Sequence, residues 1–306
     1  MANQPIIDFD VSAEDFFAPL NLPQSTKDII FGIIAAYTGA DPSRSSMLSI
    51  VAKVAAFGHS PYGFVGALTE RFVGGATRLL KGMIDGSKLE VRLDHRVVSV
   101  NRTPDGVTVR TDEEGFVLKA SECIIAVPTN ALKHVDFTPD LSLGRMKRSH
   151  SRHIGRLLKP IIHISNIPAG VFALRISDLQ MVCTAYELAD GSSVLCGFGS
   201  DGIGDLDLDN RESVERALRK YFPEVEVLSI CHPDWLSDPL FNGTHCVNRL
   251  GEAYEFLAAM NEPEDRLVFA GTDVDTSIWR SWMEAALNSA RDVVGVTSGN
   301  LARRSQ

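Results

Sequence analysis

The sequence has fewer basic than acidic residues, and it lacks a long apolar segment. Lys and Arg number 30 against 39 Asp and Glu, which gives a formal net charge of −9 and a pI near 5.4. This balance argues against nucleic acids and anionic membranes as partners, because both attract basic surfaces. The longest apolar run, Ile29 to Tyr37, is interrupted by Gly32 and is far shorter than the roughly 20 residues of a membrane-spanning helix. We therefore expect no nucleic-acid partner and no membrane segment.

Targeting and disulfide signals are also scarce. Met1 to Gln4 carries no basic charge and no apolar segment follows it, so a secretory signal peptide is not expected. The cysteines are odd in number and widely spaced: Cys123, Cys183, Cys196, Cys231 and Cys246. Reduced thiols in a cytoplasmic protein are the simplest interpretation. With 306 residues, 44% of them hydrophobic, the chain can bury a large core and form two domains.

One glycine-rich sequence, Gly197 to Gly202, has the G-x-G-x-x-G pattern of dinucleotide-binding turns. Such a turn must open a helix at once, because the helix N-terminus binds the pyrophosphate. Here the next helical pattern begins only after Asp209, which we expect to be the N-cap. The intervening carboxylates, Asp201, Asp205, Asp207 and Asp209, would repel a pyrophosphate. We predict a strand end and a loop here, and residues 1–60 supply no such turn either.

Hydrophobic periodicity predicts helices early in the chain and strands later. Ser12 is a candidate N-cap, and helical patterns follow over 26–37 and 43–57. Another helix is expected after Gly74-Gly75, with three strands before residue 135. Strand-like segments separated by turn residues then predict an antiparallel sheet. Its strands are expected at 159–165, 171–176, 180–186, 193–198 and 225–231, with a helix at 210–221.

The most informative segment lies near the C-terminus. An apolar strand from Arg266 to Phe269 runs into the turn Ala270-Gly271, and an amphipathic helix starts near Trp282. This order places the free N–H groups of a helix N-terminus beside the end of a strand. They can bind an anion or an electron-rich ring edge there.

A series of motifs occurs in a fixed order along the chain. They are Phe72-Val73-Gly74-Gly75, the strand that contains Val97, Gly106 to Thr111, Ala120 to Pro128, Phe137-Thr138-Pro139, Gly155 to Lys159, Phe269 to Asp273 and the triplet Trp282-Met283-Glu284. Together they resemble the motifs of flavin-dependent amine oxidases of the monoamine oxidase family. Each motif alone is weak, but their shared order over residues 60–295 makes a chance match improbable.

The resemblance implies a mixed α/β (α+β) fold in which flavin and substrate domains are discontinuous in sequence. It implies a helical part of the substrate domain at 1–70, a flavin-domain segment at 71–135, the substrate-domain antiparallel sheet with its helix at 136–258, and a C-terminal flavin segment at 259–306. Family members open with a strand, a G-x-G-x-x-G turn and a helix for the FAD pyrophosphate. The fold is therefore expected to be incomplete, with this half supplied by a separate chain or lost.

The resemblance also assigns a site. Non-covalent FAD is expected to contact Val97, Gly271, Thr272, Asp273, Trp282 and Met283. Lys159 corresponds to the lysine above flavin N5, which holds a water or dioxygen during reoxidation. Periodicity alone would make it an outward-facing strand lysine. Trp282 corresponds to an aromatic ring that helps to form a cage for the amine, and a core aromatic residue is the alternative.

Two departures from the family pattern concern this cage. Ser281 and Ala285 stand where the family has glycine, and their Cβ atoms are expected to crowd the flavin ring. In the closest register, His245 takes the position of a flavin-attaching cysteine and Cys246 that of the second cage aromatic. Covalent flavin attachment is therefore not expected, and the cage is expected to be incomplete.

The chain has one basic cluster, made up of Arg145, Lys147, Arg148, His150, Arg152, His153 and Arg156. We predict a solvent-exposed helix face here, with phosphate contact as the alternative. His150 and His153, with His163, have no Cys or carboxylate at ligand spacing, so no metal site is expected.

Two functions remain open from the sequence. The first is an FAD-dependent amine oxidase that oxidises a small-molecule amine to an imine with dioxygen, working with a dinucleotide-binding part on another chain. The second is a non-catalytic truncated homologue, a partner-binding protein or remnant, whose apolar surface would otherwise be covered by the absent half.

Overall fold

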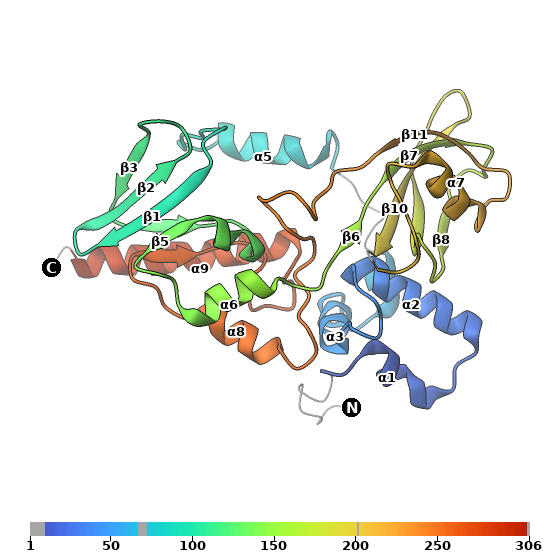
Figure 1. Cartoon of the computed structure of the whole chain (residues 1–306), viewed down its shortest axis with the longest axis horizontal. Coiled ribbons are helices and arrows are strands. Elements are labelled where there is room, and N and C mark those ends of the chain that lie inside the picture. Colours follow the sequence, from blue (N-terminus) through green and yellow to red (C-terminus); the bar gives the residue numbers. More distant parts are fainter. Residues whose placement is uncertain (1–9, 67–71, 201, 305–306) are drawn as a thin grey trace.

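The computed structural model describes residues 10–66, 72–200 and 202–304, with side chains described up to residue 296. The elements gather in two lobes joined by extended segments (Figure 1). Four helices open the described chain: α1 (Ala13–Phe17), α2 (Gln24–Thr38), α3 (Met47–Ala56) and α4 (Pro61–Gly66). Ser12 caps α1 as predicted, since its Oγ accepts a hydrogen bond from the Asp15 N–H at 2.9 Å.

The first lobe combines these helices with an antiparallel sheet. Its strand order is β11-β7-β10-β9-β8, with β6 paired to β10. The strands are β6 (Leu157–Leu158), β7 (Ile161–Ser165), β8 (Phe172–Leu174), β9 (Met181–Glu187), β10 (Ser193–Ser200) and β11 (Glu226–Cys231). Helix α7 (Arg211–Arg219) buries Val214 and Leu218 against Ile162 and Leu195 of the sheet. The α2 residue Ala36 packs with Leu157, Met181 and Phe198. The predicted antiparallel sheet and its helix are confirmed.

The predicted strand that begins at Lys159 differs from the structure. β6 ends at Leu158 and β7 begins at Ile161, so Lys159 and Pro160 lie between two strands. Proline has no N–H for a sheet ladder, which explains the interruption. Its carbonyl oxygen still accepts a hydrogen bond from the Gly197 N–H at 2.9 Å. Lys159 is consequently an exposed residue of a connecting segment.

The G-x-G-x-x-G sequence forms the predicted strand end and loop. β10 continues to Ser200, Asp201 lies outside the described residues, and α7 starts only at Arg211. The backbone N–H of Asp205 donates to Asp178 Oδ1 at 3.2 Å. Gly204 has φ +76°, and a Cβ there would lie 2.1 Å from the same Asp178 oxygen. These loop groups are therefore engaged within the protein and unavailable to a phosphate.

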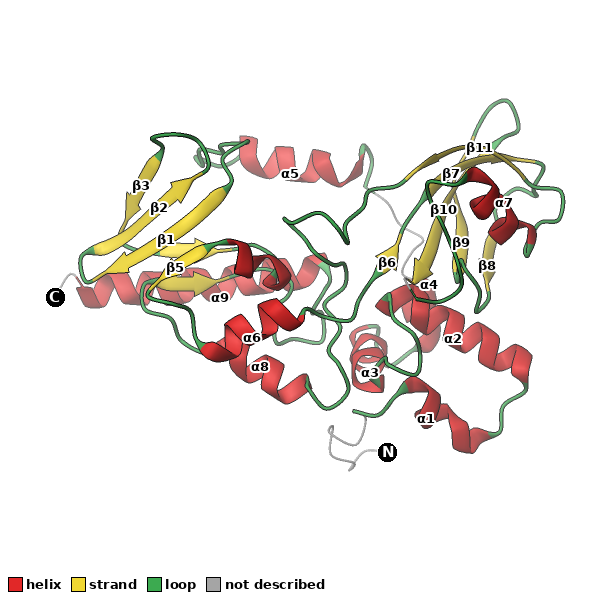
Figure 2. Ribbon diagram, viewed as in Figure 1, coloured by secondary structure: helices red, strands yellow, loops and turns green. Residues whose placement is uncertain are grey.

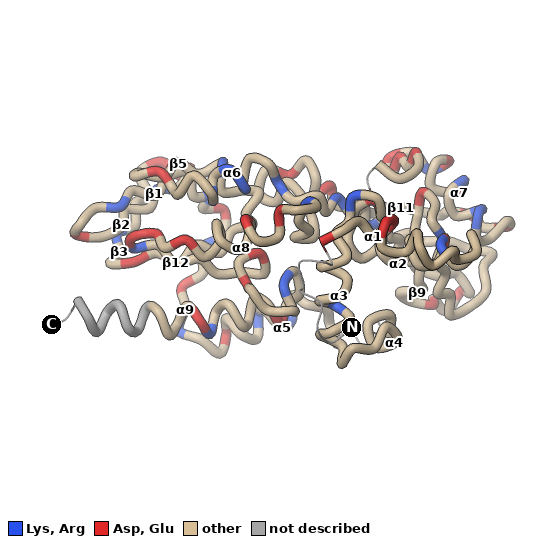
Figure 3. The backbone as a smooth tube through the Cα atoms, turned by 90° about the horizontal axis from the view of Figure 1, so that it is seen from below, with Lys and Arg blue, Asp and Glu red and all other residues tan. Residues whose placement is uncertain are grey.

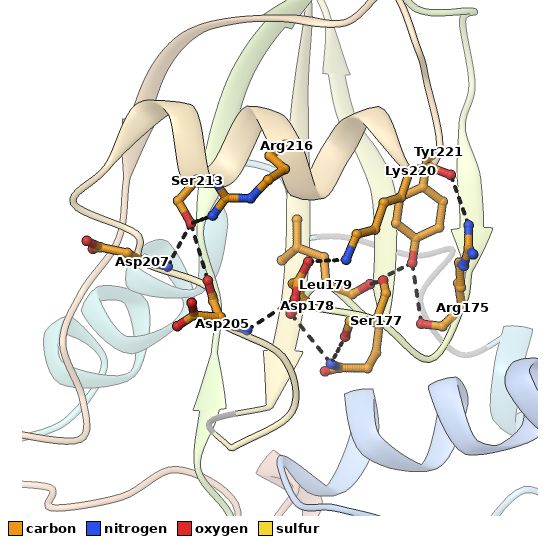
Figure 4. Close-up of polar contacts among 11 residues, drawn as sticks. Arg175, Ser177, Asp178, Leu179, Asp205, Asp207, Ser213, Arg216, Lys220 and Tyr221 are labelled. Atoms are coloured by element: carbon orange, nitrogen blue, oxygen red, sulfur yellow. Dashed lines mark hydrogen bonds and ion pairs between the residues drawn. The ribbon is translucent and has the colours of Figure 1, made fainter.

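The N-cap of α7 is one residue later than predicted. Asn210, not Asp209, accepts the capping hydrogen bond, from the Ser213 N–H at 3.2 Å. Ser213 also accepts from the Asp207 N–H at 3.1 Å, which closes the loop onto the helix (Figure 4).

The second lobe is built from segments that are distant in sequence (Figure 2). A four-stranded sheet has the order β3-β2-β1-β5, and β12 pairs in parallel with β4. The strands are β1 (Val97–Thr103), β2 (Gly106–Thr111), β3 (Val117–Ala120), β4 (Cys123–Ile125), β5 (Asp136–Thr138) and β12 (Leu267–Phe269). The helices are α5 (Gly75–Asp85), η3 (Thr129–His134), α6 (Leu143–Ser151), α8 (Ala253–Asn261) and α9 (Met283–Arg304).

Residues on both sides of the predicted boundary at 135 belong to this second lobe. β5 pairs in parallel with β1 through Ser99 and Asp136. Phe137 and Leu141 join Val100 and Leu267 in one hydrophobic core. The division at 1–70, 71–135, 136–258 and 259–306 stays a prediction, and residues 1–9 and 67–71 of it lie outside the described residues.

The basic cluster is not the solvent-exposed helix face that the sequence predicted. Arg145 is 1% exposed and Arg148 is 5% exposed. Arg145 donates to the carbonyl oxygens of Met260 and Glu262 at 3.0 and 2.9 Å, so it ties α6 to the end of α8. Arg148 pairs with Glu252 at 2.5 Å. Partners from α8 thus balance charges that the local pattern alone would leave in water.

Arg145 also takes part in a buried ion network. Glu264 lies between it and Arg102, with Arg102 Nη1 at 3.0 Å from Oε2 and Arg145 Nε at 3.7 Å from Oε1. The three side chains are 6%, 1% and 7% exposed for Arg102, Arg145 and Glu264. The Arg145 guanidinium lies 3.7 Å from the Phe269 ring centroid, so the network supports β12 directly.

Charge and cysteine distribution agree with the composition. Lys and Arg are interspersed with Asp and Glu along both lobes (Figure 3). No helix within the described residues combines the length and apolar character needed to cross a membrane. All five cysteines are free thiols. The cytoplasmic location stays a prediction.

Candidate active site

A cavity of about 250 Å³ lies where the helical layer meets the C-terminal segment. Tyr37 lines it from α2, and Lys53 lines it from α3. His245 and the loop from Asp275 to Trp282 close the opposite side. The cavity therefore brings Trp282, one of the two predicted catalytic residues, beside a helix that the sequence analysis had not connected with it.

The turn after β12 is fastened to the start of α9. The Gly271 N–H donates to Ser289 Oγ at 2.9 Å, and the Ser281 N–H donates to the Thr272 carbonyl at 3.2 Å. These bonds hold Gly271, Thr272 and Asp273 close to Trp282 and Met283, which start the helix. Five of the six predicted cofactor contacts are thus in one neighbourhood.

Val97 is the sixth predicted cofactor contact and lies elsewhere. It begins β1 and packs, half-buried, against the core that contains Val100 and Leu267. It does not line the cavity. Its predicted contact with the adenine stays a prediction.

Trp282 has aromatic and basic neighbours from α3. Its ring stands edge-to-face with Phe57, the C-cap of α3, at 5.5 Å between centroids, and Phe57 also contacts Trp279 at 5.4 Å. Lys53 Nζ lies 5.7 Å from the Trp282 ring centroid. Sequence reasoning missed Phe57 and Lys53. The one available signal was a lysine within the otherwise apolar pattern of α3.

Lys53 is held in a poorly solvated position. Its Nζ donates to the backbone carbonyl oxygen of Arg280. Burial lowers the pKa of Lys53 to about 7, and the nearby positive charge of Arg280 acts in the same direction. Cys246 and Asp275 oppose the shift only in part. A lysine in this state changes its charge near neutral pH.

His245 and Cys246 stay neutral in the cavity wall. The pKa of His245 is lowered to about 4, mostly by burial and in addition by the charges of Lys159 and Lys53. Burial raises the pKa of the Cys246 thiol. The chain approaches His245 closely at Gly155, where a Cβ would lie 2.1 Å from the His245 carbonyl oxygen. This contact accounts for the glycine of the G-x-x-x-K motif.

Lys159 lies on the first lobe near this wall. Its Nζ is 4.9 Å from the Phe198 ring centroid. The positive charges of Lys159 and Lys53 both lower the pKa of His245. The two predicted catalytic residues, Lys159 and Trp282, therefore share the surroundings of His245 without touching each other. The role of Lys159 in catalysis stays a prediction.

Ser281 and Ala285, which stand where the family has glycine, differ in their surroundings. Ser281 adopts φ +74°, a left-handed conformation that favours glycine. Its Oγ donates to the Cys246 carbonyl at 3.1 Å, which compensates in part. Ala285 is fully buried within the protein, so its Cβ packs against the chain. The expected crowding of a flavin ring thus applies to Ser281 more than to Ala285.

Asp273 belongs to a buried polar group. Its Oδ2 accepts from the Thr129 N–H at 2.9 Å and lies 3.6 Å from His153 Nε2. Ligand atoms of His153, Cys246 and Asp273 all lie within 4.8 Å of one another. No metal site was expected from the sequence, because these three residues are far apart along the chain. Burial favours neutral forms here, since it lowers the pKa of His153 and raises that of Cys246.

Comparison with known proteins identifies the fold. Residues 8–296 match the family described as flavin containing amine oxidoreductase. The chain belongs to this family. Structures of putrescine oxidase superpose with TM-scores of 0.81 for a triple mutant and 0.79 for the wild type bound to putrescine, at 20% identity, and the chain covers 70% of each. The predicted flavin amine oxidase fold is confirmed.

Two curated members of the family illustrate the relationship. The chain is 29% identical to (S)-6-hydroxynicotine oxidase of Paenarthrobacter nicotinovorans over 294 residues, which are 96% of the chain and 68% of that enzyme. It is 28% identical to pseudooxynicotine dehydrogenase of a Pseudomonas species over 288 residues, 92% of the chain and 57% of that enzyme. The chain thus spans about three fifths of these flavin amine oxidoreductases.

FAD is the cofactor of this family, and the described residues fit one end of it. The turn after β12 and the start of α9 offer a ring, Trp282, and a helix N-terminus, where the first N–H groups of a helix in general lack intrahelical acceptors. That donor set suits the polar edge of a flavin ring. A pyrophosphate needs a glycine-rich turn that opens a helix. The G-x-G-x-x-G sequence does not provide it, because a loop follows β10 and α7 starts only at Arg211, so these residues do not fit the pyrophosphate.

Proposed function

We propose that this chain is the substrate-binding and flavin-facing part of an FAD-dependent amine oxidase. The observation that carries the proposal is the position of Trp282, which lines the cavity of about 250 Å³ and directly precedes the N-terminus of α9. The substrate is a small amine, and its C–N single bond is oxidised to an imine. The names of the relatives, which include hydroxynicotine oxidase and putrescine oxidase, support an amine as the substrate class.

The residues of the chain have separate tasks in this proposal. Bound flavin supplies the electron acceptor for the oxidation. The Trp282 ring attracts the amine through its π face, and Phe57 fixes the ring by edge-to-face packing. Lys159, near His245, serves the reoxidation of flavin by dioxygen, the proposed final acceptor.

We propose further that the pyrophosphate of FAD is held by a dinucleotide-binding part outside these 306 residues, on a separate chain. Exposed apolar side chains support this. Among the described residues, α5 buries none of its side chains, and Leu80 and Met83 are 58% and 53% exposed. Ile124 of β4 is 51% exposed, although parallel strands are normally covered on both faces. Such apolar surface is typical of an interface.

A non-catalytic partner-binding protein remains the second candidate, because the same exposed surface supports it. FAD titration separates the two. The chain alone should show no flavin absorbance after incubation with FAD and desalting. A family dinucleotide-binding segment, added as a separate polypeptide, should restore binding, and anaerobic addition of an amine should then bleach the flavin. That segment alone is the control. Flavin binding without bleaching by any of a panel of primary and secondary amines would favour the non-catalytic protein.

A further inference from the structure

Two basic side chains, Lys53 and Arg280, line the same cavity as Trp282. They reach it from different parts of the chain, α3 and the loop before α9. The Lys53 amino group bonds to the Arg280 backbone carbonyl, and the positive charge of Arg280 acts on Lys53. Burying two like charges together is costly unless something else offsets it.

Arg280 is a half-buried residue whose guanidinium lacks a carboxylate partner. Its Nη1 atom is buried without an acceptor among the described residues. Its guanidinium lies 5.0 Å from the Phe256 ring centroid, and no ion pair with a carboxylate occurs in the part of the chain that the structure describes. Because Arg280 lines the cavity and has no carboxylate partner, its positive charge is available to an anionic oxygen group of a ligand there.

The other titratable groups that face Lys53 do not fill this role. Asp275 is 5% exposed, and its Oδ2 already accepts from Ser277 Oγ. Burial keeps His245 and Cys246 in neutral forms, through a lowered and a raised pKa respectively. The cavity therefore holds one carboxylate, Asp275, and two basic groups: Arg280, which is always charged, and Lys53, whose charge depends on pH.

We propose that the cavity binds a small amine that also carries a carboxylate or another anionic oxygen group, and that Lys53 and Arg280 hold this group. The inference rests on the proposed amine oxidase function and names its substrate class. Lys53 Nζ and the Trp282 ring centroid are 5.7 Å apart, so the amine and the anionic group of one small molecule can reach both. Lys53 and Arg280 select the substrate and disfavour a dication such as a diamine, since a second cationic group would meet two positive charges.

Ligand binding tests the proposal without flavin. The probes are 3-phenylpropanoate, 3-phenylpropanol and 3-phenylpropylamine, which differ only in the charge of one end. Each is titrated into the 306-residue chain at pH 6 and followed by tryptophan fluorescence, because Trp282 lines the cavity and Trp279 lies beside Phe57. The carboxylate should bind about tenfold more tightly than the alcohol. Equal binding of acid and alcohol, or no binding of the acid, would overturn the proposal.

Variants assign the effect to Lys53. Lys53→Met should remove most of the preference for the acid over the alcohol. Lys147→Met removes one positive charge from α6 outside the cavity, where the side chain is 68% exposed, and should leave the preference intact. Circular dichroism verifies the fold of each variant. An equal loss in both variants would mean that overall charge, not the cavity, attracts the acid.

The pH dependence of acid binding distinguishes a binding role of Lys53 from a purely structural one. Because the pKa of Lys53 is about 7, affinity for the acid should fall about tenfold between pH 6 and pH 8.5. Lys53→Arg keeps a charge throughout this range and should bind the acid with no such fall. A wild-type affinity independent of pH, or an identical fall in Lys53→Arg, would refute the role of Lys53. Failure of the amine bleaching test with these results intact would instead refute the oxidase function.

Discussion

Removing the charge of Glu264 should destabilise the second lobe strongly. In Glu264→Gln, the shape of the side chain is kept while two buried guanidinium groups lose their shared carboxylate. Arg102 Nη1 lies 3.0 Å from Oε2, and the Ser142 N–H donates to Oε1 at 2.8 Å. Breaking a buried pair in this way costs about 3–5 kcal/mol, because a charge is left buried without compensation.

We expect Glu264→Gln to lower the free energy of unfolding by an amount near the lower end of that range. The glutamine oxygen can keep one hydrogen bond, and Glu262 still attracts Arg145. A loss of about 3 kcal/mol corresponds to a fall in Tm of about 5 °C for a chain of this size.

Urea unfolding followed by circular dichroism measures the free energy of unfolding, and a thermal melt gives the Tm. Glu255→Gln is the matched control. Its carboxylate pairs with Arg148 at 2.6 Å but is 65% exposed, and Arg148 keeps Glu252. The control should lose less than about 1 kcal/mol. A loss below about 1 kcal/mol for Glu264→Gln, or equal losses in the two variants, would show that the buried network contributes little.

Three further predictions concern the site. Trp282→Ala should weaken amine binding in the reconstituted holoenzyme, while Trp282→Tyr should retain most of it. If amine binding is unchanged in Trp282→Ala and the protein is only destabilised, by the about 3–5 kcal/mol that a new cavity costs, Trp282 is a core residue only. Lys159→Met should slow flavin reoxidation by dioxygen far more than anaerobic reduction by amine in stopped-flow measurements, and equal effects on both half-reactions would remove Lys159 from the site. The folded pKa of His245, about 4, lies below the unfolded value of about 6.5, so the stability that this residue contributes is present above pH 6.5 and is lost as the pH falls toward 4. Between pH 7 and pH 5 the free energy of unfolding should therefore fall by about 2 kcal/mol more in the wild type than in His245→Phe, and parallel pH curves would contradict the burial of the neutral imidazole.

Local patterns in the sequence were enough to predict most elements. The helix at α3 follows from an apolar periodicity behind a serine, and Ser46 caps it by accepting from the Leu48 N–H at 3.2 Å. The strands from β7 to β11 follow from alternation between turn residues. Both patterns depend on neighbours within a few residues, so these elements can be predicted without knowledge of the fold. Pro160 shows the limit, since it divides a strand that the apolar pattern made continuous.

The order of the motifs also identified the family, including the neighbourhood of Gly271, Thr272 and Trp282. These residues are close in sequence, and hydrogen bonds such as that from the Ser281 N–H to Thr272 join them directly. The same reasoning could not place Lys159 relative to Trp282, because Lys159 follows β6 and Trp282 precedes α9, and these elements belong to different lobes (Figure 1).

The composition and motif order of the sequence by itself determined the family, the expected cofactor and the main elements. The tertiary structure alone decided which charges are buried and what surrounds Trp282. Arg145 carries the same local pattern as an exposed helix residue, yet Glu264 and the end of α8 enclose it. Lys53 and Phe57 reach Trp282 only because α3 packs against the C-terminal segment. Burial and electrostatics depend on every surface that meets at a point, and those surfaces come from segments far apart in the chain.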